Sequence, residues 1–129
     1  MAEKNKILVI DDNESFLEIF STNLQVSGYE VYTEVNAKNG FERIYDIMPD
    51  LIILDIYLPD KTGFEIAEEI KKDERISSIP IMLITADTSD TAATVDEAFN
   101  RGADDCIFKP VNMDDTLKRI ANLLNEFKK

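Results

Sequence analysis

The sequence contains no histidine and a single cysteine, Cys106. The lack of histidine excludes histidine-activated nucleophiles and histidine metal ligands. One cysteine cannot form a disulfide within the chain, which fits a reducing compartment. The chain also lacks a run of about 18 apolar residues that could cross a bilayer, and its first six residues lack the apolar stretch of a secretory signal. We therefore expect a cytoplasmic protein with no membrane insertion.

Basic residues are scarce, because 14 lysines and arginines face 26 aspartates and glutamates, for a net charge of −12. Nucleic-acid binding depends on clustered lysine and arginine, so we expect no direct nucleic acid binding by this domain. The length of 129 residues predicts one domain, 1–129. The chain stops directly after the last predicted helix, without a linker, which slightly favours a stand-alone protein over one domain of a longer chain.

Strand-like segments alternate with segments of helical periodicity along the whole chain. Residues 51–55 and 79–85 are apolar without alternation, which is typical of strands covered on both faces. The predicted strands are 6–11, 29–34, 51–55, 79–85 and 106–108. The predicted apolar helix faces are Phe16, Leu17, Phe20 and Leu24; Phe41, Ile44, Tyr45 and Met48; Phe64, Ala67 and Ile70; Val95, Ala98 and Phe99; and Leu117, Ile120, Ala121 and Leu124. This alternation predicts an α/β fold, a doubly wound (βα)5 domain with a five-stranded parallel sheet.

Polar residues follow four of the five predicted strands. Ligands of such sheets bind beyond the carboxyl ends of the strands. Asp11 and Asp12 follow the first strand, Asp55 closes the third, Thr85 the fourth, and Lys109 follows the fifth. By connectivity alone, these five residues meet at one edge of the sheet and form a candidate site.

Three carboxylates brought together repel one another, by about 1 kcal/mol per pair at about 4 Å in water and about 4 at an effective dielectric near 20. Lys109 supplies one compensating charge, and a divalent cation would supply two. The donors are hard oxygens, which favour Mg²⁺, with Mn²⁺ as a substitute. A site with Mg²⁺, a lysine, a threonine hydroxyl and a spare carboxylate suits phosphoryl transfer to an aspartate.

Four motifs in register carry a resemblance to a known family. They are "DD" at 11–12, "LDIYLPDKTG" at 54–63, "TA" at 85–86 and "KP" at 109–110. Together they resemble the receiver domain of bacterial response regulators in two-component signalling, including the chemotaxis regulators, over nearly the whole chain. The resemblance implies a flavodoxin-like sheet with strand order 2-1-3-4-5.

The resemblance also implies roles for the acidic residues. Asp55 matches the phosphate acceptor, which also contributes to the metal site. Asp12 matches the direct metal ligand, and Asp11 matches the ligand that acts through water. The backbone carbonyl of Tyr57 matches the last protein ligand of the metal.

Further roles follow for the remaining positions. Thr85 matches the hydroxyl that moves to the phosphoryl group, and Lys109 the cation that contacts it. The peptide bond between Lys109 and Pro110 resembles the family's cis peptide. Tyr57 and Asp87 are expected to flank the line of water attack and to tune the lifetime of the acyl phosphate. Pro59 and Gly63 are interpreted as loop geometry and are left out of the site.

Cys106 departs from the family, which has tyrosine or phenylalanine at this position as an aromatic switch. We interpret Cys106 as a small buried residue of the fifth strand rather than a redox group. Phe108 shares its face of the strand, but it lies two residues, or about 6.6 Å, further along. We therefore expect Phe108 to be poorly placed to follow Thr85, and we expect signal transmission without an aromatic switch at position 106.

The resulting prediction is a phosphoprotein of a phosphorelay that takes its phosphoryl group from a histidine kinase or phosphotransfer protein onto Asp55. It would catalyse only its own phosphorylation and dephosphorylation, and would bind a downstream protein or effector domain through its fourth helix, fifth strand and fifth helix. One alternative is a Mg²⁺-dependent aspartyl-phosphate phosphatase of haloacid dehalogenase type. That group needs a second acid at position 13, where this chain has asparagine. The other is a flavodoxin-like binding module, which needs a glycine-rich phosphate loop that "DDNESF" does not provide.

Overall fold

Five parallel strands form one sheet in the order β2-β1-β3-β4-β5. The structure is a computed structural model, and it describes residues 4–87 and 89–127. The strands are β1 (Lys6–Ile10), β2 (Glu30–Glu34), β3 (Leu51–Asp55), β4 (Ile81–Thr85) and β5 (Asp105–Phe108). The order expected from the family resemblance is confirmed, and it brings the carboxyl ends of β1, β3 and β4 next to one another at one edge.

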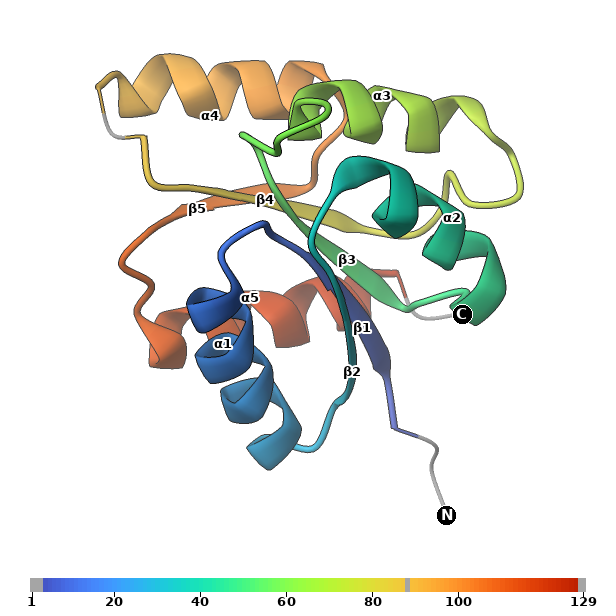
Figure 1. Cartoon of the computed structure of the whole chain (residues 1–129), viewed down its shortest axis with the longest axis vertical. Coiled ribbons are helices and arrows are strands. Elements are labelled where there is room, and N and C mark those ends of the chain that lie inside the picture. The colour runs from blue at the N-terminus through green and yellow to red at the C-terminus, as the bar shows by residue number, and fades with distance from the viewer. Residues whose placement is uncertain (1–3, 88, 128–129) are drawn as a thin grey trace.

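A helix follows each strand, and the helices cover both faces of the sheet. They are α1 (Glu14–Val26), α2 (Ala37–Ile47), α3 (Gly63–Lys72), α4 (Thr91–Asn100) and α5 (Met113–Glu126). Helices α1 and α5 lie on one face, and α2, α3 and α4 lie on the other (Figure 1). The predicted doubly wound (βα)5 architecture is therefore confirmed. Within the described residues, no helix is both long enough and apolar enough to span a bilayer.

The helices begin where the sequence provides a side chain that can accept a hydrogen bond from the first turn. The residues that do so are Asn13, Asn36, Thr62, Asp90 and Asn112, and each accepts from the N–H three positions on. Such caps stabilise a helix by about 1 kcal/mol each. They fix the points at which the chain leaves the carboxyl edge of the sheet, and therefore the shape of the loops that carry the site.

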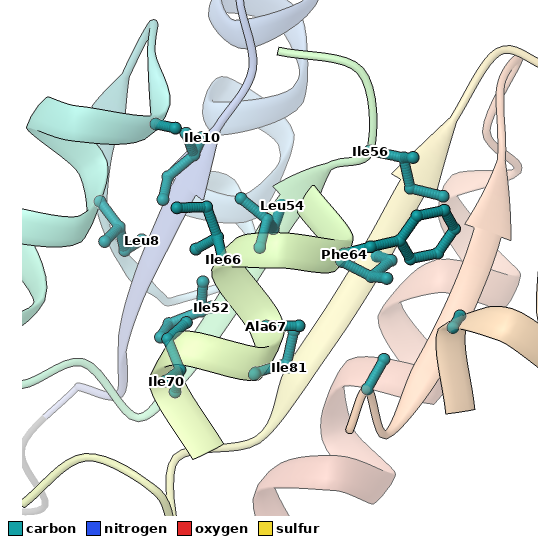
Figure 2. Close-up of a cluster of buried hydrophobic side chains, with 14 of the residues drawn as sticks. Leu8, Ile10, Ile52, Leu54, Ile56, Phe64, Ile66, Ala67, Ile70 and Ile81 are labelled. Carbon is teal, nitrogen blue, oxygen red and sulfur yellow. The ribbon is translucent and has the colours of Figure 1, made fainter. Parts of the chain in front are cut away.

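The two central strands β3 and β4 are buried along their whole length, as expected for strands covered on both faces. On one face, the side chains of α3 point toward strands β1, β3 and β4 (Figure 2). On the other face, Phe20 and Leu24 of α1 pack with Ile120 of α5. This apolar sandwich fixes the strands, so that the polar residues at their carboxyl ends rest on a rigid base.

Three predicted details of the helix faces are wrong. Met48 lies outside α2, with a left-handed backbone (φ 46°) and an exposed side chain, because Pro49 follows and disfavours helical geometry at the residue before it. Phe99 of α4 is 49% exposed. On α5, Ala121 is exposed and Leu123 is buried in its place.

The fourth strand begins at Ile81 rather than at residue 79, since Pro80 has no N–H to donate to a neighbouring strand.

Candidate functional site

The five residues predicted to form the site do meet at the carboxyl edge of the sheet. An open pocket of about 510 Å³ lies there, with eight residues in its lining. Asp11 lies fully buried at the end of β1, next to this pocket. The lining residues are Asp12, Asn13, Asp55, Tyr57, Thr85, Ala86, Asp87 and Lys109.

Asp11, Asp12 and Asp55 form a group of carboxylates at the base of the pocket. Each offers one oxygen, and these oxygens all lie within 4.8 Å of one another. Asp11 is 0% exposed and Asp55 is 6% exposed, whereas Asp12 is exposed. The backbone N–H of Asn13 donates to Asp11 Oδ1 at 2.9 Å and so fixes the turn that follows β1. The predicted meeting of three acids is confirmed.

Lys109 provides the positive charge in this group, and its partner is Asp11. Lys109 Nζ lies 2.7 Å from Asp11 Oδ2, and it also lies 4.2 Å from the centre of the Phe16 ring. Because the Asp11 carboxylate is fully buried, an unpaired charge there would be costly, and the ammonium offsets it. Sequence reasoning placed Phe16 only on the apolar face of its helix and did not anticipate its contact with the ammonium.

The environment of Asp55 disfavours its charged form. Burial is the main cause, and the nearby negative charge of Asp11 adds to it, while Lys109 acts in the opposite direction. Together they raise the pKa of Asp55 from 3.8 to about 7. Burial and the neighbouring acid together outweigh the attraction of the lysine, so Asp55 holds its proton more tightly than an exposed aspartate does.

The carboxylate group has the chemistry of a site for a hard divalent cation. Its donors are oxygens alone, with no sulfur or imidazole, and they converge within the spacing that one ion can bridge. Repulsion among these three acids, two of which are buried, would be relieved by two positive charges. Asp11, Asp12 and Asp55 therefore fit Mg²⁺ or Mn²⁺.

Thr85, Asp87 and Tyr57 also line the pocket. Thr85 is 0% exposed, and its hydroxyl oxygen accepts a hydrogen bond from the backbone N–H of Asp87 at 3.1 Å. The Tyr57 hydroxyl donates to Asp87 Oδ2 across a long 3.4 Å, and the Tyr57 side chain is 53% exposed. The two residues expected to flank the line of water attack thus contact each other in the lining of the pocket, which the sequence did not indicate.

The loop between β3 and α3 contains one contact that sequence reasoning missed. Asp60 accepts hydrogen bonds from the first two N–H groups of α2, at 2.9 and 3.0 Å. No sequence signal pairs this aspartate with a helix start 23 residues earlier. At Gly63, an added Cβ would lie 2.5 Å from the carbonyl oxygen of Asp55, so only glycine fits the close approach.

Cys106 is buried on β5, as expected, and burial raises the pKa of its thiol to about 11. The thiol therefore stays protonated near neutral pH. The strand register pairs Phe108 with Thr85 and pairs Cys106 with Leu83. Phe108 is partly buried against the core and lies level with Thr85. The register of two strands in a parallel sheet could not be read from either strand alone.

The peptide bond between Lys109 and Pro110 is cis, as the family resemblance implied.

Comparisons with known proteins agree with this geometry. Residues 7–121 match the family model "Response regulator receiver domain". The DNA-binding dual master transcriptional regulator RpaA of Synechocystis sp. is 35% identical over 121 residues, which cover 92% of this chain and 48% of RpaA. The chain thus spans about half the length of this curated relative.

Solved structures of response regulators superpose on nearly the whole chain. A CheY-like receiver domain protein from Methanospirillum hungatei is 31% identical with a TM-score of 0.87, and the match covers 98% of each chain. The chemotaxis response regulator CheY4 of Vibrio cholerae is 29% identical with a TM-score of 0.85, covering 94% of this chain and 99% of CheY4. This chain therefore belongs to the response regulator receiver domain family of two-component signalling.

Proposed function

We propose that Asp55 is the phosphate acceptor and that it receives the phosphoryl group from a phosphohistidine of a histidine kinase or phosphotransfer protein. A carboxylate oxygen of Asp55 attacks the phosphorus, the bond from phosphorus to the donor nitrogen breaks, and that nitrogen keeps the electron pair. The product is an acyl phosphate on Asp55. The observation that carries the proposal is a buried aspartate at the end of a fixed strand, next to two further acids and a lysine, in an open pocket.

The reaction requires positive charge around Asp55. Asp12 would hold Mg²⁺ directly, Asp11 would hold it through water, and Asp55 and the Tyr57 backbone carbonyl would complete the protein's ligands, with Mn²⁺ as a substitute. The ion would neutralise phosphoryl oxygens as charge develops on them. The support is the oxygen-only donor set within 4.8 Å.

Lys109 and Thr85 act on the phosphoryl group after transfer. The Lys109 ammonium, now 2.7 Å from Asp11, lies in the same pocket as Asp55 and would contact a phosphoryl oxygen. The Thr85 hydroxyl, which accepts the N–H of Asp87, would turn to donate to another oxygen. Tyr57 and Asp87 would restrict the water that hydrolyses the acyl phosphate. The protein would thus catalyse only its own phosphorylation and dephosphorylation.

The movement of Thr85 would shift the face formed by α4, β5 and α5, and so change the binding of a downstream protein or effector domain. Phe108 lies level with Thr85, and the Phe99 side chain of α4 is half exposed to solvent.

We place phosphorylation in the cytoplasm, where a single cysteine stays reduced. With a net charge of −12, this domain would not bind nucleic acid itself, although RpaA is a DNA-binding protein.

A phosphatase of haloacid dehalogenase type fits this site less well. That group needs an acid two residues after the first, at position 13, and Asn13 instead accepts the Phe16 N–H at 3.0 Å as the cap of α1. The position that should supply proton transfer is therefore occupied by a helix cap.

A small phosphodonor tests the proposed acceptor directly. Acetyl phosphate with Mg²⁺ should add one phosphoryl group to the protein, and chelation of the metal with EDTA should prevent it. Asp55→Asn should abolish the addition, because an amide oxygen is a poor nucleophile. Intact-mass spectra with undiminished labelling of Asp55→Asn would falsify the assignment.

A further inference from the structure

Asp60, in the loop between β3 and α3, caps a helix that begins 23 residues earlier in the chain. Its Oδ1 accepts the N–H of Ala37 at 2.9 Å, and its Oδ2 accepts the N–H of Lys38 at 3.0 Å. These are the first two residues of α2, whose N–H groups have no acceptor within the helix. The hydrogen bond from Ala37 is also the main reason that the pKa of Asp60 lies below its ordinary value. The carboxylate is therefore ionised at neutral pH.

The same loop is closed at its base, next to the proposed acceptor. Gly63 donates its N–H to the carbonyl of Ile56 at 2.6 Å, and a Cβ on this glycine would lie 2.5 Å from the carbonyl oxygen of Asp55. Tyr57 forms an isolated antiparallel bridge with Thr62. These contacts fix the base of the loop, and the hydrogen bonds to α2 fix its tip.

The start of α2 is in turn connected to the acids that follow β1. The N–H of Asp11 donates to the carbonyl of Glu34 at 3.0 Å, where β2 ends. A corner of two residues leads from Glu34 to Ala37, the first residue of α2. Helices α2 and α3 lie next to each other on the same face of the sheet (Figure 1). The residues on either side of this corner thus contact both loops that carry proposed metal ligands.

We propose that Asp60 is a positioning residue, whose carboxylate fixes the loop between β3 and α3 on α2 and thereby sets the Tyr57 carbonyl relative to Asp11 and Asp12. The inference rests on the proposed function, because it concerns the same metal-dependent phosphorylation. Asp60 is not part of the carboxylate group that could hold an ion among the described residues. Groups that orient metal ligands without touching the ion typically change metal affinity 10- to 100-fold when removed.

A second cap on the same helix separates positioning from helix stability. The side chain of Asn36 accepts the N–H of Asn39 at 2.8 Å, a hydrogen bond within the first turn of α2. Removal of either cap should lower the melting temperature of the protein, because N–H groups of the first turn of α2 lose their acceptor. Only the removal of the Asp60 carboxylate would also release the loop that follows the acceptor. Asn36→Ala is therefore the matched control.

The experiment compares the wild-type chain of 129 residues with Asp60→Ala and Asn36→Ala. Mg²⁺ affinity is measured by titration calorimetry, and the initial rate of phosphorylation by acetyl phosphate is measured at saturating Mg²⁺. Both are done in about 0.5 M KCl, where the Debye length is roughly 4 Å, so that the loss of one negative charge does not imitate the effect. We expect Asp60→Ala to weaken Mg²⁺ binding about tenfold and to slow phosphorylation. Asn36→Ala should lower the melting temperature similarly and leave both other values unchanged.

Wild-type Mg²⁺ affinity in Asp60→Ala, or equal losses in the two alanine variants, would overturn the inference. If Asp60→Ala does not fold, Asp60→Asn provides the comparison, since an amide has only one oxygen and so loses one of the two hydrogen bonds to α2. Weaker Mg²⁺ binding by Asp60→Asn than by Asn36→Ala would support the inference, and wild-type affinity would overturn it. A wild-type protein that neither binds Mg²⁺ nor accepts a phosphoryl group would overturn the proposed function, and this inference with it.

Discussion

Asp55→Asn should stabilise the metal-free protein, and by far more above pH 7 than near pH 4. In the folded protein, burial and the charge of Asp11 raise the pKa of Asp55 from 3.8 to about 7. The folded state therefore binds a proton that the unfolded chain releases. Below about pH 4, both states are protonated and Asp55 costs nothing. As the pH rises from about 4 to 7, the unfolded state ionises first, and the free energy of unfolding of the wild type falls.

The size of this effect follows from the difference between the two pKa values. Each pKa unit corresponds to about 1.4 kcal/mol, so the change from 3.8 to about 7 sets a ceiling of about 4 kcal/mol. Asp55 lines a pocket open to water, which screens part of the repulsion. We therefore expect Asp55→Asn to be more stable than the wild type by about 2 kcal/mol above pH 7. Near pH 4 the two proteins should be nearly equal.

Urea unfolding of both proteins in EDTA, repeated between about pH 4 and pH 8, measures this difference. Mg²⁺ should reverse the order, because the ion binds only the intact carboxylate group and stabilises the wild type. A stability difference that is independent of pH would contradict the raised pKa of Asp55. A wild type more stable than Asp55→Asn in EDTA at about pH 8 would contradict the cost of a charged Asp55 in this buried, acidic environment.

Three further predictions concern the metal, the lifetime of the acyl phosphate and the switch. Asp12→Ala should weaken Mg²⁺ binding far more than Asp11→Ala in calorimetric titration, because a direct ligand is lost; equal affinities would reject this division of roles. Replacing Tyr57 with asparagine should shorten the half-life of the acyl phosphate, because a bulky side chain that obstructs water is removed. The half-life is measured by loss of label, and an unchanged half-life would contradict this prediction. Cys106→Ala should leave phosphorylation and partner binding nearly intact, whereas Thr85→Ala should uncouple them; loss of phosphorylation-dependent binding in folded Cys106→Ala would make the cysteine a switch element.

The layout of the site was predictable because it depends on connectivity rather than on side-chain detail. Apolar strands without alternation at 51–55 and 79–85 required cover on both faces, which led to a parallel sheet. In a parallel sheet, the residues after each strand emerge at one edge, so Asp11, Asp55 and Lys109 had to meet there. The structure confirms this, with the acids within 4.8 Å and the lysine 2.7 Å from Asp11.

The details that escaped prediction depend on contacts between distant segments. Phe108 lies level with Thr85 because of the register of β4 and β5, which arises from the packing of the whole sheet. Asp60 reaches the start of α2 because two loops meet in space, and neither loop contains a motif for that contact. The ion pair of Lys109 with Asp11 was also not foreseen, since the family resemblance implied only a contact with the phosphoryl group.

A measurement of where the phosphoryl group resides tests the central claim most directly. The wild type is incubated with acetyl phosphate and Mg²⁺, the acyl phosphate is trapped by reduction with borohydride, and the modified residue is located by peptide mass spectrometry. Reduction converts an aspartyl phosphate to homoserine, so the account predicts homoserine at position 55 and none in the sample with EDTA. Homoserine at Asp11 or Asp12 with unmodified Asp55, or a phosphoryl group on a hydroxyl residue, would contradict it.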